Sequence, residues 1–219
     1  MKVIDLGAQD TVLNQYVSEL RDVEIQRNRM LFRHNIERIG HIMAYEISKT
    51  LSFKTIKVQT PLDIAEASVP TDQIVVGTVF RAGLPLHQGF LDVFDKAKTA
   101  FVSAYRYYTD RECHNVDVHI EYIAAPNLND TTFILVDPML ATGESLELAY
   151  NAFLTNGKPR RLVLASVIAA QPGIDHLQKA FPSDDVLLYC AAIDPTLNDR
   201  KYIVPGLGDA GDLMYGEKL

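Results

Sequence analysis

The sequence is poor in the features that mark secreted, membrane-bound and nucleic-acid-binding proteins. Of its 219 residues only Cys113 and Cys190 are cysteines, and they lie far apart with neither metal-binding nor redox spacing. It has no run of about 18 uncharged apolar residues, and its first residues lack the apolar core of a signal peptide. A formal net charge of -7 gives no sign of the basic surface that nucleic acids or anionic membranes require. We therefore predict a soluble protein of the reducing cytoplasm.

Two common nucleotide-binding motifs are also missing. No G-x-x-x-x-G-K-[ST] is present, which excludes P-loop nucleotide hydrolysis. Residues 205–212, PGLGDAGD, contain a formal G-x-G-x-x-G, but only eight residues follow Gly211. A dinucleotide-binding unit needs a strand before the glycines, a helix after them and an acidic residue about 20 positions further on. The chain has no room for such a unit here.

What the chain does have is apolar sequence in alternating strand-like and helix-like segments. Its 47% hydrophobic content is enough for the core of one large domain, which we predict to span residues 1–219. An apolar stripe at helical spacing predicts a helical region over 12–51. The predicted strands are 55–60, 73–80, 99–108, 116–125, 131–138, 161–170 and 186–193. One predicted helix follows the loop after residue 80, and two others cover 143–157 and 173–181. This order indicates an α/β fold with a mostly parallel central sheet flanked by helices, an N-terminal helical arm (1–54) and a turn-rich C-terminal segment (195–219).

The most informative stretch is ILVDPMLATGES, residues 134–145, in which a buried strand ends on Asp137. Ligands of open parallel sheets bind beyond the carboxyl ends of the strands. The small turn that follows leads into a predicted helix, whose free N–H groups and dipole favour a phosphate. Thr142 and Ser145 add hydroxyl donors, and Asp137 can accept hydrogen bonds from sugar hydroxyls. The pattern predicts a phosphorylated ribose; ordinary turn chemistry is the alternative.

Two further groups of residues suggest ligand contacts. The glycine-dense loop 205–212 can offer main-chain groups to a small planar ligand, and a buried mismatch there would cost about 1–3 kcal/mol. Arg81 follows the strand 73–80, and Arg106 lies near the end of the next strand. The planar guanidinium suits a pyrophosphate. The alternatives are a surface loop and solvent-exposed arginines.

The histidines give weaker signals. His114 and His119, like Cys113, have no clear metal spacing, and we predict that they are exposed loop and strand residues. His87 lies in the segment after Arg81, where it either touches a substrate or packs in the core. The role of Arg33 stays open.

Three blocks of this sequence resemble one enzyme family. VDPMLATGES (136–145) closely resembles the 5-phosphoribosyl-1-pyrophosphate (PRPP) motif of type I phosphoribosyltransferases, and its Asp-Pro-Met-Leu-Ala-Thr-Gly form is similar to that of uracil phosphoribosyltransferases. RAGL (81–84) resembles their pyrophosphate loop, and YIVPGLGDAGD (202–212) their C-terminal signature. The resemblance implies a type I phosphoribosyltransferase fold with a C-terminal hood loop over the base. It also implies a pentosyltransferase that converts uracil and PRPP to UMP and pyrophosphate, with Mg²⁺, as a homodimer or larger homo-oligomer.

The resemblance also implies a role for individual residues. The implied catalytic residues are Asp137, Arg81 and Arg106. The implied PRPP-binding residues are Arg81, Arg106, Asp137, Met139, Leu140, Ala141, Thr142, Gly143, Glu144, Ser145 and Asp209. The implied uracil-binding residues are Tyr202, Ile203, Gly208, Asp209 and Ala210. PRPP and water would hold most of the Mg²⁺ coordination, so no protein metal ligand is named.

The sequence departs from the family pattern at Glu144, which is often glycine in these enzymes. A carboxylate here would have to point away from the phosphate, because like charges repel. The run PLHQG after Arg81-Ala82-Gly83-Leu84 also differs from the usual small residues. Two other functions stay open: transfer to a purine or orotate, and a non-enzymatic regulator that binds uridine nucleotides and RNA. The C-terminal signature argues against the first, and the net charge gives the second no support.

Overall fold

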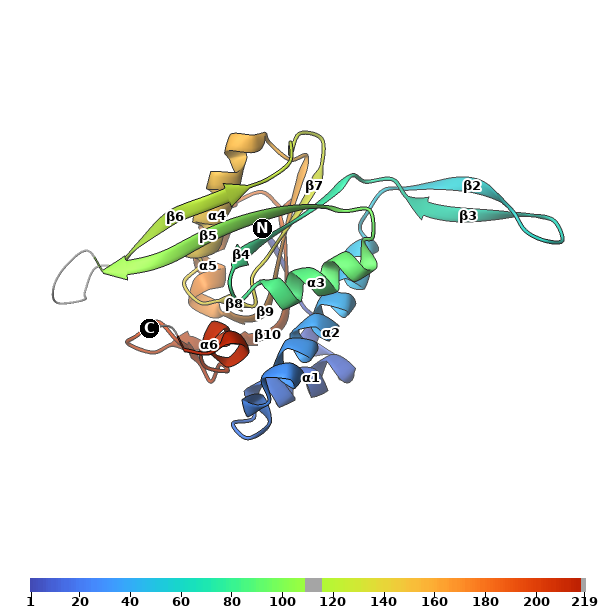
Figure 1. Cartoon of the computed structure of the whole chain (residues 1–219). Helices are drawn as coiled ribbons and strands as arrows, with labels where there is room; N and C mark the ends of the chain where they lie inside the picture. Colours follow the sequence, from blue (N-terminus) through green and yellow to red (C-terminus); the bar gives the residue numbers. More distant parts are fainter. Residues whose placement is uncertain (109–115, 218–219) are drawn as a thin grey trace.

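A central, mostly parallel sheet organises the chain (Figure 1). The computed structural model describes residues 1–108 and 116–217, and the side chains of 1–103 and 121–217. The strand order is β1-β10-β9-β7-β4-β5-β6, with β8 paired to β9. Only the pairing of β5 with β6 is antiparallel within this described sheet. Its strands are β1 (Lys2–Asp5), β4 (Ile74–Phe80), β5 (Lys98–Tyr108), β6 (Val116–Ala124), β7 (Thr132–Val136), β8 (Met139–Leu140), β9 (Arg161–Ala170) and β10 (Leu187–Asp194).

Helices cover both faces of this sheet, as the sequence predicted. Figure 1 shows α1, α2 and α3 together on one face and α4 with α5 on the other. The buried residues accordingly form two apolar clusters, one under each set of helices. The helices are α1 (Val12–Arg21), α2 (Arg29–Ser48), α3 (Leu84–Val93), α4 (Glu144–Phe153), α5 (Gln171–Ala180) and α6 (Ala210–Tyr215).

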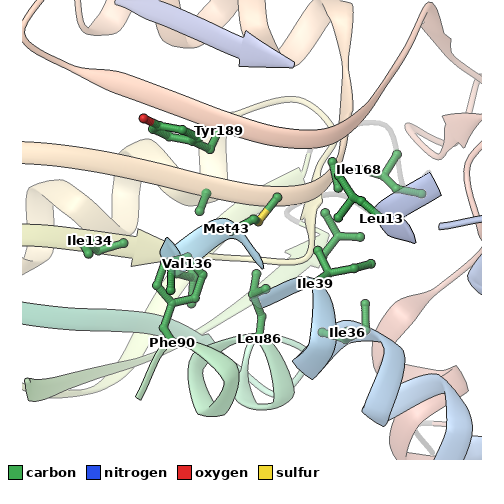
Figure 2. Close-up of a cluster of buried hydrophobic side chains, with 14 of the residues drawn as sticks. Leu13, Ile36, Ile39, Met43, Leu86, Phe90, Ile134, Val136, Ile168 and Tyr189 are labelled. Carbon is green, nitrogen blue, oxygen red and sulfur yellow. The ribbon is translucent and has the colours of Figure 1, made fainter. Parts of the chain in front are cut away.

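The core confirms the periodicity read from the sequence. The stripe on α2 is fully buried against α3 and the sheet, with Ile36, Ile39 and Met43 at its centre (Figure 2). All residues of β7 are buried, as expected for a strand covered by helices on both faces. Burial of each such aliphatic side chain contributes about 1.5–3 kcal/mol to the free energy of unfolding.

The N-terminal region is not helical throughout, which corrects the prediction for residues 1–54. Residues 2–5 form β1, which pairs with β10 at the edge of the sheet. The helical stretch breaks after α1 because Asp22 accepts hydrogen bonds from the main-chain N–H groups of Glu24 and Ile25. Asn28 then caps the start of α2. These local side-chain bonds compete with helix continuation, and the apolar stripe does not reveal them.

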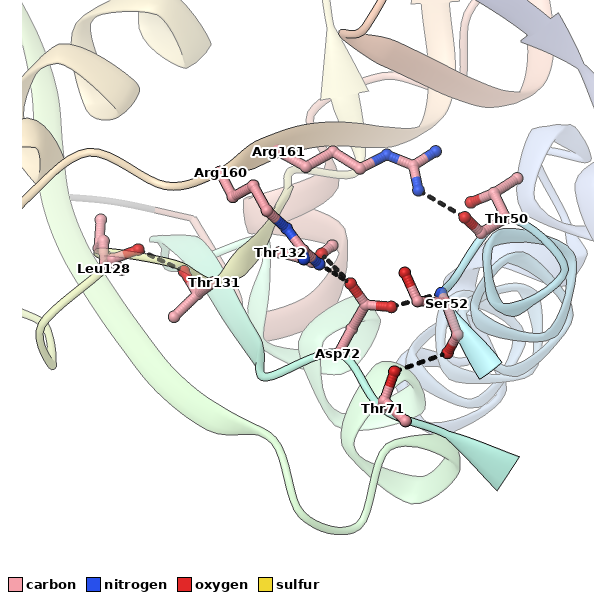
Figure 3. A network of polar contacts seen from close by, with 9 residues as sticks. All are labelled: Thr50, Ser52, Thr71, Asp72, Leu128, Thr131, Thr132, Arg160 and Arg161. Atoms are coloured by element: carbon pink, nitrogen blue, oxygen red, sulfur yellow. Dashed lines mark hydrogen bonds and ion pairs between the residues drawn. The ribbon is translucent and has the colours of Figure 1, made fainter. Parts of the chain in front are cut away.

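A β-hairpin of β2 (Phe53–Gln59) and β3 (Ile64–Pro70) projects from the body of the molecule (Figure 1). The sequence predicted only its first strand. Buried Asp72 holds its base: the carboxylate accepts from Ser52 N–H at 2.6 Å and Thr132 Oγ1 at 3.0 Å, and it pairs with Arg160 (Figure 3). Thr132 begins β7, so this network lies at the amino end of the sheet, opposite Asp137.

No helix among the residues described combines the length and apolarity that crossing a membrane would take.

Candidate active site

Arg81 and Asp137 both lie at the carboxyl ends of the strands, because they follow the neighbouring parallel strands β4 and β7. β4 and β7 pair in register, with Thr78 opposite Val136, and each strand is followed at once by its polar residue. The parallel strand β10 ends on the same side of the sheet, at Asp194, and there the chain enters the C-terminal segment. Three segments that are distant in sequence therefore meet at the carboxyl ends of the strands, where open α/β sheets bind ligands.

The turn after β7 and the start of α4, residues 137–145, form a concave main-chain segment that we call the phosphate cradle. The main-chain N–H of Met139 donates to Asp137 Oδ1 at 3.2 Å, and β8 then pairs with β9. Gly143 has φ of +87°, and a Cβ there would lie 2.9 Å from the carbonyl oxygen of Gly173, so only glycine fits without strain. No side chain of the described residues caps the start of α4. Its first N–H groups remain available to a ligand.

The carboxylate of Glu144 contacts a residue of this cradle, and the expectation that it points away from a bound phosphate stays a prediction. Thr142 Oγ1 donates to Glu144 Oε2 at 3.1 Å, and Lys201 Nζ lies 4.0 Å from the same oxygen. A carboxylate in the first turn of a helix is favoured by the helix dipole, which accounts for its position. A phosphate would have to replace the carboxylate as the partner of Thr142.

The C-terminal segment folds into a compact loop that we call the hood, residues 195–217. Its short strands β11 (Thr196–Leu197) and β12 (Ile203–Val204) pair antiparallel, and α6 follows them. Gly206 has φ of +59°, and a Cβ there would lie 2.1 Å from the Ile203 carbonyl oxygen, which makes the turn specific to glycine. Of the predicted uracil-binding residues, Ile203 and Ala210 are buried, whereas Tyr202 and Gly208 are exposed.

An ion pair joins the hood to the segment after β4. Arg81 Nη2 lies 3.1 Å from Asp212 Oδ1, and Asp212 N–H in turn donates to Asp209 Oδ1, the cap of α6. Lys201 and Glu144 make a looser contact between the hood and the phosphate cradle. The structure thus brings together all three blocks that the sequence singled out. Arg81 and Asp212 are only half-buried, so a ligand anion can exchange for this carboxylate.

Other predicted residues fall partly outside what the structure describes. Arg106 lies on β5, opposite Val118 of β6, but its side chain is not among those described. The same holds for His119, while Cys113 and His114 lie outside the described residues altogether. The predictions for these four residues therefore stay predictions.

His87 packs in the core and does not face the site. Its side chain is buried on α3 against the ring of Phe101, at 5.1 Å between ring centroids. Nε2 has no hydrogen-bond partner among the described residues. Burial lowers the pKa of His87 below its usual range, and a hydrogen bond with the main chain of Val76 only partly offsets this. The packing interpretation of His87 is therefore the correct one.

This burial predicts a pH dependence of stability. Because the folded state resists protonation of His87, the unfolded chain binds one more proton below about pH 6.5, and the free energy of unfolding falls as pH drops. The loss is at most about 1.4 kcal/mol per pH unit and ends at the lowered folded pKa. Urea unfolding at pH 7.5, 6.5 and 5.5 gives the free energy of unfolding at each pH. This free energy should change less with pH in His87→Gln than in the wild type, because glutamine keeps an amide donor but does not titrate. An equal change of the free energy of unfolding with pH in both proteins would contradict the prediction.

Comparison with known proteins decides the family. The family model described as uracil phosphoribosyltransferase matches residues 8–217. A uracil phosphoribosyltransferase of Porphyromonas gingivalis is 56% identical over 219 residues, with 100% of each chain covered. The chain belongs to the uracil phosphoribosyltransferase family. One of Thermococcus kodakarensis is 36% identical over 208 residues, covering 94% of this chain and 87% of the relative. The solved AQ2163 protein of Aquifex aeolicus has a TM-score of 0.85 at 27% identity, with 99% of both chains covered.

Membership of the uracil phosphoribosyltransferase family confirms the predicted fold class and agrees with the donor set at the site. Within the described residues, the group of His and acidic side chains close enough to hold an ion is Glu37, His41 and Asp92, on α2 and α3. Asp137 and Asp209 form no such ready-made cage. Mg²⁺ commonly keeps several waters and uses one or two carboxylates together with substrate phosphates. The residues present fit an ion that the substrate brings with it.

Two arginines of the N-terminal helices contact the hood from outside the three blocks, and their partners were not predicted from the sequence. Arg21 on α1 and Arg33 on α2 both reach the C-terminal segment: Arg21 bonds to Asp194 and Gly206, and Arg33 Nη1 donates to the Met214 carbonyl at 2.7 Å. The sequence left the role of Arg33 open and did not single out Arg21, because the partners of both arginines lie more than 170 positions away. Asp212, by contrast, stands inside the quoted block 202–212, and only its pairing with Arg81 was unforeseen.

Proposed function

We propose that this chain transfers the 5-phosphoribosyl group of PRPP to uracil, giving UMP and pyrophosphate, as a pyrimidine salvage enzyme of the cytoplasm. The observation that carries the proposal is the meeting of three segments at one sheet edge. The phosphate cradle after β7, Arg81 after β4 and the main-chain hood after β10 supply one recognition surface for each part of the two substrates. Phosphate, pyrophosphate and base each have a matching group.

The cradle fits the 5′-phosphate of PRPP. The N–H groups at the start of α4 and the hydroxyls of Thr142 and Ser145 would donate to its oxygens, while the main chain of 139–143 closes around them. Leu140 and Ala141 are buried, so they contribute through the main chain alone. Lys201 balances the charge of Glu144 nearby.

Arg81 and Asp137 fit the two ends of the reacting bond. Arg81, and Arg106 with it, would stabilise the negative charge that builds on pyrophosphate as it leaves. Asp137 would accept hydrogen bonds from the ribose hydroxyls and favour the positive charge that develops on the ring. Mg²⁺ would supply further charge stabilisation on the pyrophosphate, and the carboxylates of Asp137 and Asp209 would be available to hold it or its waters.

The hood fits uracil through its main chain. Uracil carries two carbonyl acceptors and two N–H donors at fixed positions, and the peptide groups of Ile203, Gly208 and Ala210 would pair with them. Cytosine differs at one edge and would leave a buried group unpaired, at a cost of about 1–3 kcal/mol. Tyr202 would lie beside the ring. We also propose that the enzyme works as a homodimer or larger homo-oligomer.

The direct test is a base-competition assay. Purified protein with PRPP and Mg²⁺ should form UMP from uracil, and at least about tenfold less product from cytosine, orotate or hypoxanthine, since one unpaired buried group costs that much. The nucleoside monophosphate of each base is separated and measured by liquid chromatography, with each base alone and in pairs. Equal use of a purine or orotate would reject the assignment of the hood. Binding of a uridine-rich RNA without UMP formation would favour the regulator instead.

A further inference from the structure

A buried network ties the N-terminal helix α1 to the hood. Arg21, the last residue of α1, makes two parallel bonds to Asp194, with Nη1 to Oδ2 at 2.9 Å and Nη2 to Oδ1 at 2.7 Å. Arg21 Nη1 also donates to the carbonyl of Gly206 at 3.0 Å. The N–H of Gly206 donates to Asp194 Oδ2 at 2.8 Å. The two side chains therefore hold both polar groups of one hood residue.

The position of Gly206 gives this network its importance. Gly206 lies between Ile203 and Gly208, two of the residues whose main chain would read the base. Its turn is tight, because the Ile203 carbonyl oxygen lies 2.1 Å from the place of a Gly206 Cβ. With its N–H and C=O both fixed, the peptide planes on either side of Gly206 have little freedom to rotate. The directions of the neighbouring main-chain donors and acceptors follow from that restraint.

The chemistry of the pair suits a rigid support. Asp194 is 4% exposed and ends β10, so its carboxylate is fixed by the sheet. A buried carboxylate needs partners for its lone pairs, and here a guanidinium and a main-chain N–H provide them. The planar fork of arginine serves two carboxylate oxygens and one carbonyl at once. The ammonium of a lysine cannot reproduce this geometry.

We propose that Arg21 and Asp194 are positioning residues that set the geometry of the uracil-reading main chain. The inference rests on the proposed role of the hood. It assigns part of base recognition to α1, a helix that lies outside all three sequence blocks that resemble the family. Loosening the network should weaken contacts to the base far more than contacts to PRPP, because the phosphate cradle and Arg81 follow other strands and, of the proposed PRPP-binding residues, Asp209 alone belongs to the hood.

The test compares Arg21→Ala, Arg21→Lys and Asp194→Asn with the wild type. KM for uracil and Kd for UMP should rise about tenfold in Arg21→Ala and Asp194→Asn, the size expected when a buried hydrogen-bonded group loses its partner. KM and Kd for PRPP should stay within about twofold. Arg21→Lys should fall between Arg21→Ala and the wild type. Circular dichroism and thermal unfolding establish that each variant is folded at the assay temperature, and a variant that is not folded is replaced in the comparison by the other two.

Arg33→Ala is the matched control. It also removes an arginine that joins an N-terminal helix to a carbonyl of the hood, but at Met214 on α6, away from Gly206. It should lower the unfolding temperature without changing the ratio of the two KM values. The proposal is overturned if the Arg21 and Asp194 variants keep the wild-type ratio, or if Arg33→Ala changes the ratio equally. If the wild type discriminates between bases and the variants do so equally well, this inference alone is refuted and the proposed function stands.

Discussion

Replacing Arg81 by alanine is expected to lower kcat/KM for PRPP by about 10²–10³, the usual loss when one preorganised donor to a developing negative charge is removed. Arg81 stands at the carboxyl end of β4, and its side chain makes a half-exposed ion pair with Asp212. Initial rates of UMP formation at varied PRPP measure the effect. Arg81→Lys should recover part of the activity, since it keeps the charge but loses the planar fork.

Asp212→Asn is the control for this result. It removes the carboxylate that pairs with Arg81 at 3.1 Å without touching Arg81. Half-exposed ion pairs are worth about 0–1 kcal/mol, so KM for PRPP should change by less than about fivefold. A loss in Asp212→Asn as large as that in Arg81→Ala would show that the ion pair itself, and not the free guanidinium, is needed. An Arg81→Ala enzyme with normal kcat/KM would remove Arg81 from the pyrophosphate site.

Replacing Asp137 by asparagine is expected to lower kcat by about 10²–10³ and to change the Kd of PRPP much less. Asparagine keeps an oxygen that can accept from the N–H of Met139, so the turn should hold its shape. What is lost is the negative charge beside the ribose, which matters most when the ring becomes positive in the transition state. Single-turnover rates and calorimetric binding of PRPP separate the two effects.

Asp175→Asn serves as the control for Asp137→Asn. Asp175 is an exposed acid on α5 that accepts a hydrogen bond from Gln171 at 2.7 Å, and the same loss of charge there should leave kcat unchanged. If Asp137→Asn raised the Kd of PRPP and left kcat intact, Asp137 would be a ground-state binding residue only, and its proposed electrostatic role would be wrong.

The strands and their polar ends could be predicted because the signal is local. A strand covered on both faces, such as β7, is apolar along its whole length, and Asp137 interrupts that run at a single position. The same holds for β4 and Arg81. In contrast, β1 is only four residues long, and the break between α1 and α2 depends on side-chain bonds made by Asp22. Features of that kind leave no periodic pattern in the sequence.

The sequence by itself determined the class of fold and the family and predicted where the phosphate cradle lies, because each depends on contiguous residues whose spacing is read directly. Only the tertiary structure decided which residues meet. Arg81 faces Asp212, Glu144 stays beside Thr142, and Arg21 holds Asp194 and Gly206 from the far end of the chain. Such contacts depend on strand order and on helix packing over the whole molecule, so their geometry exists only after the chain has folded.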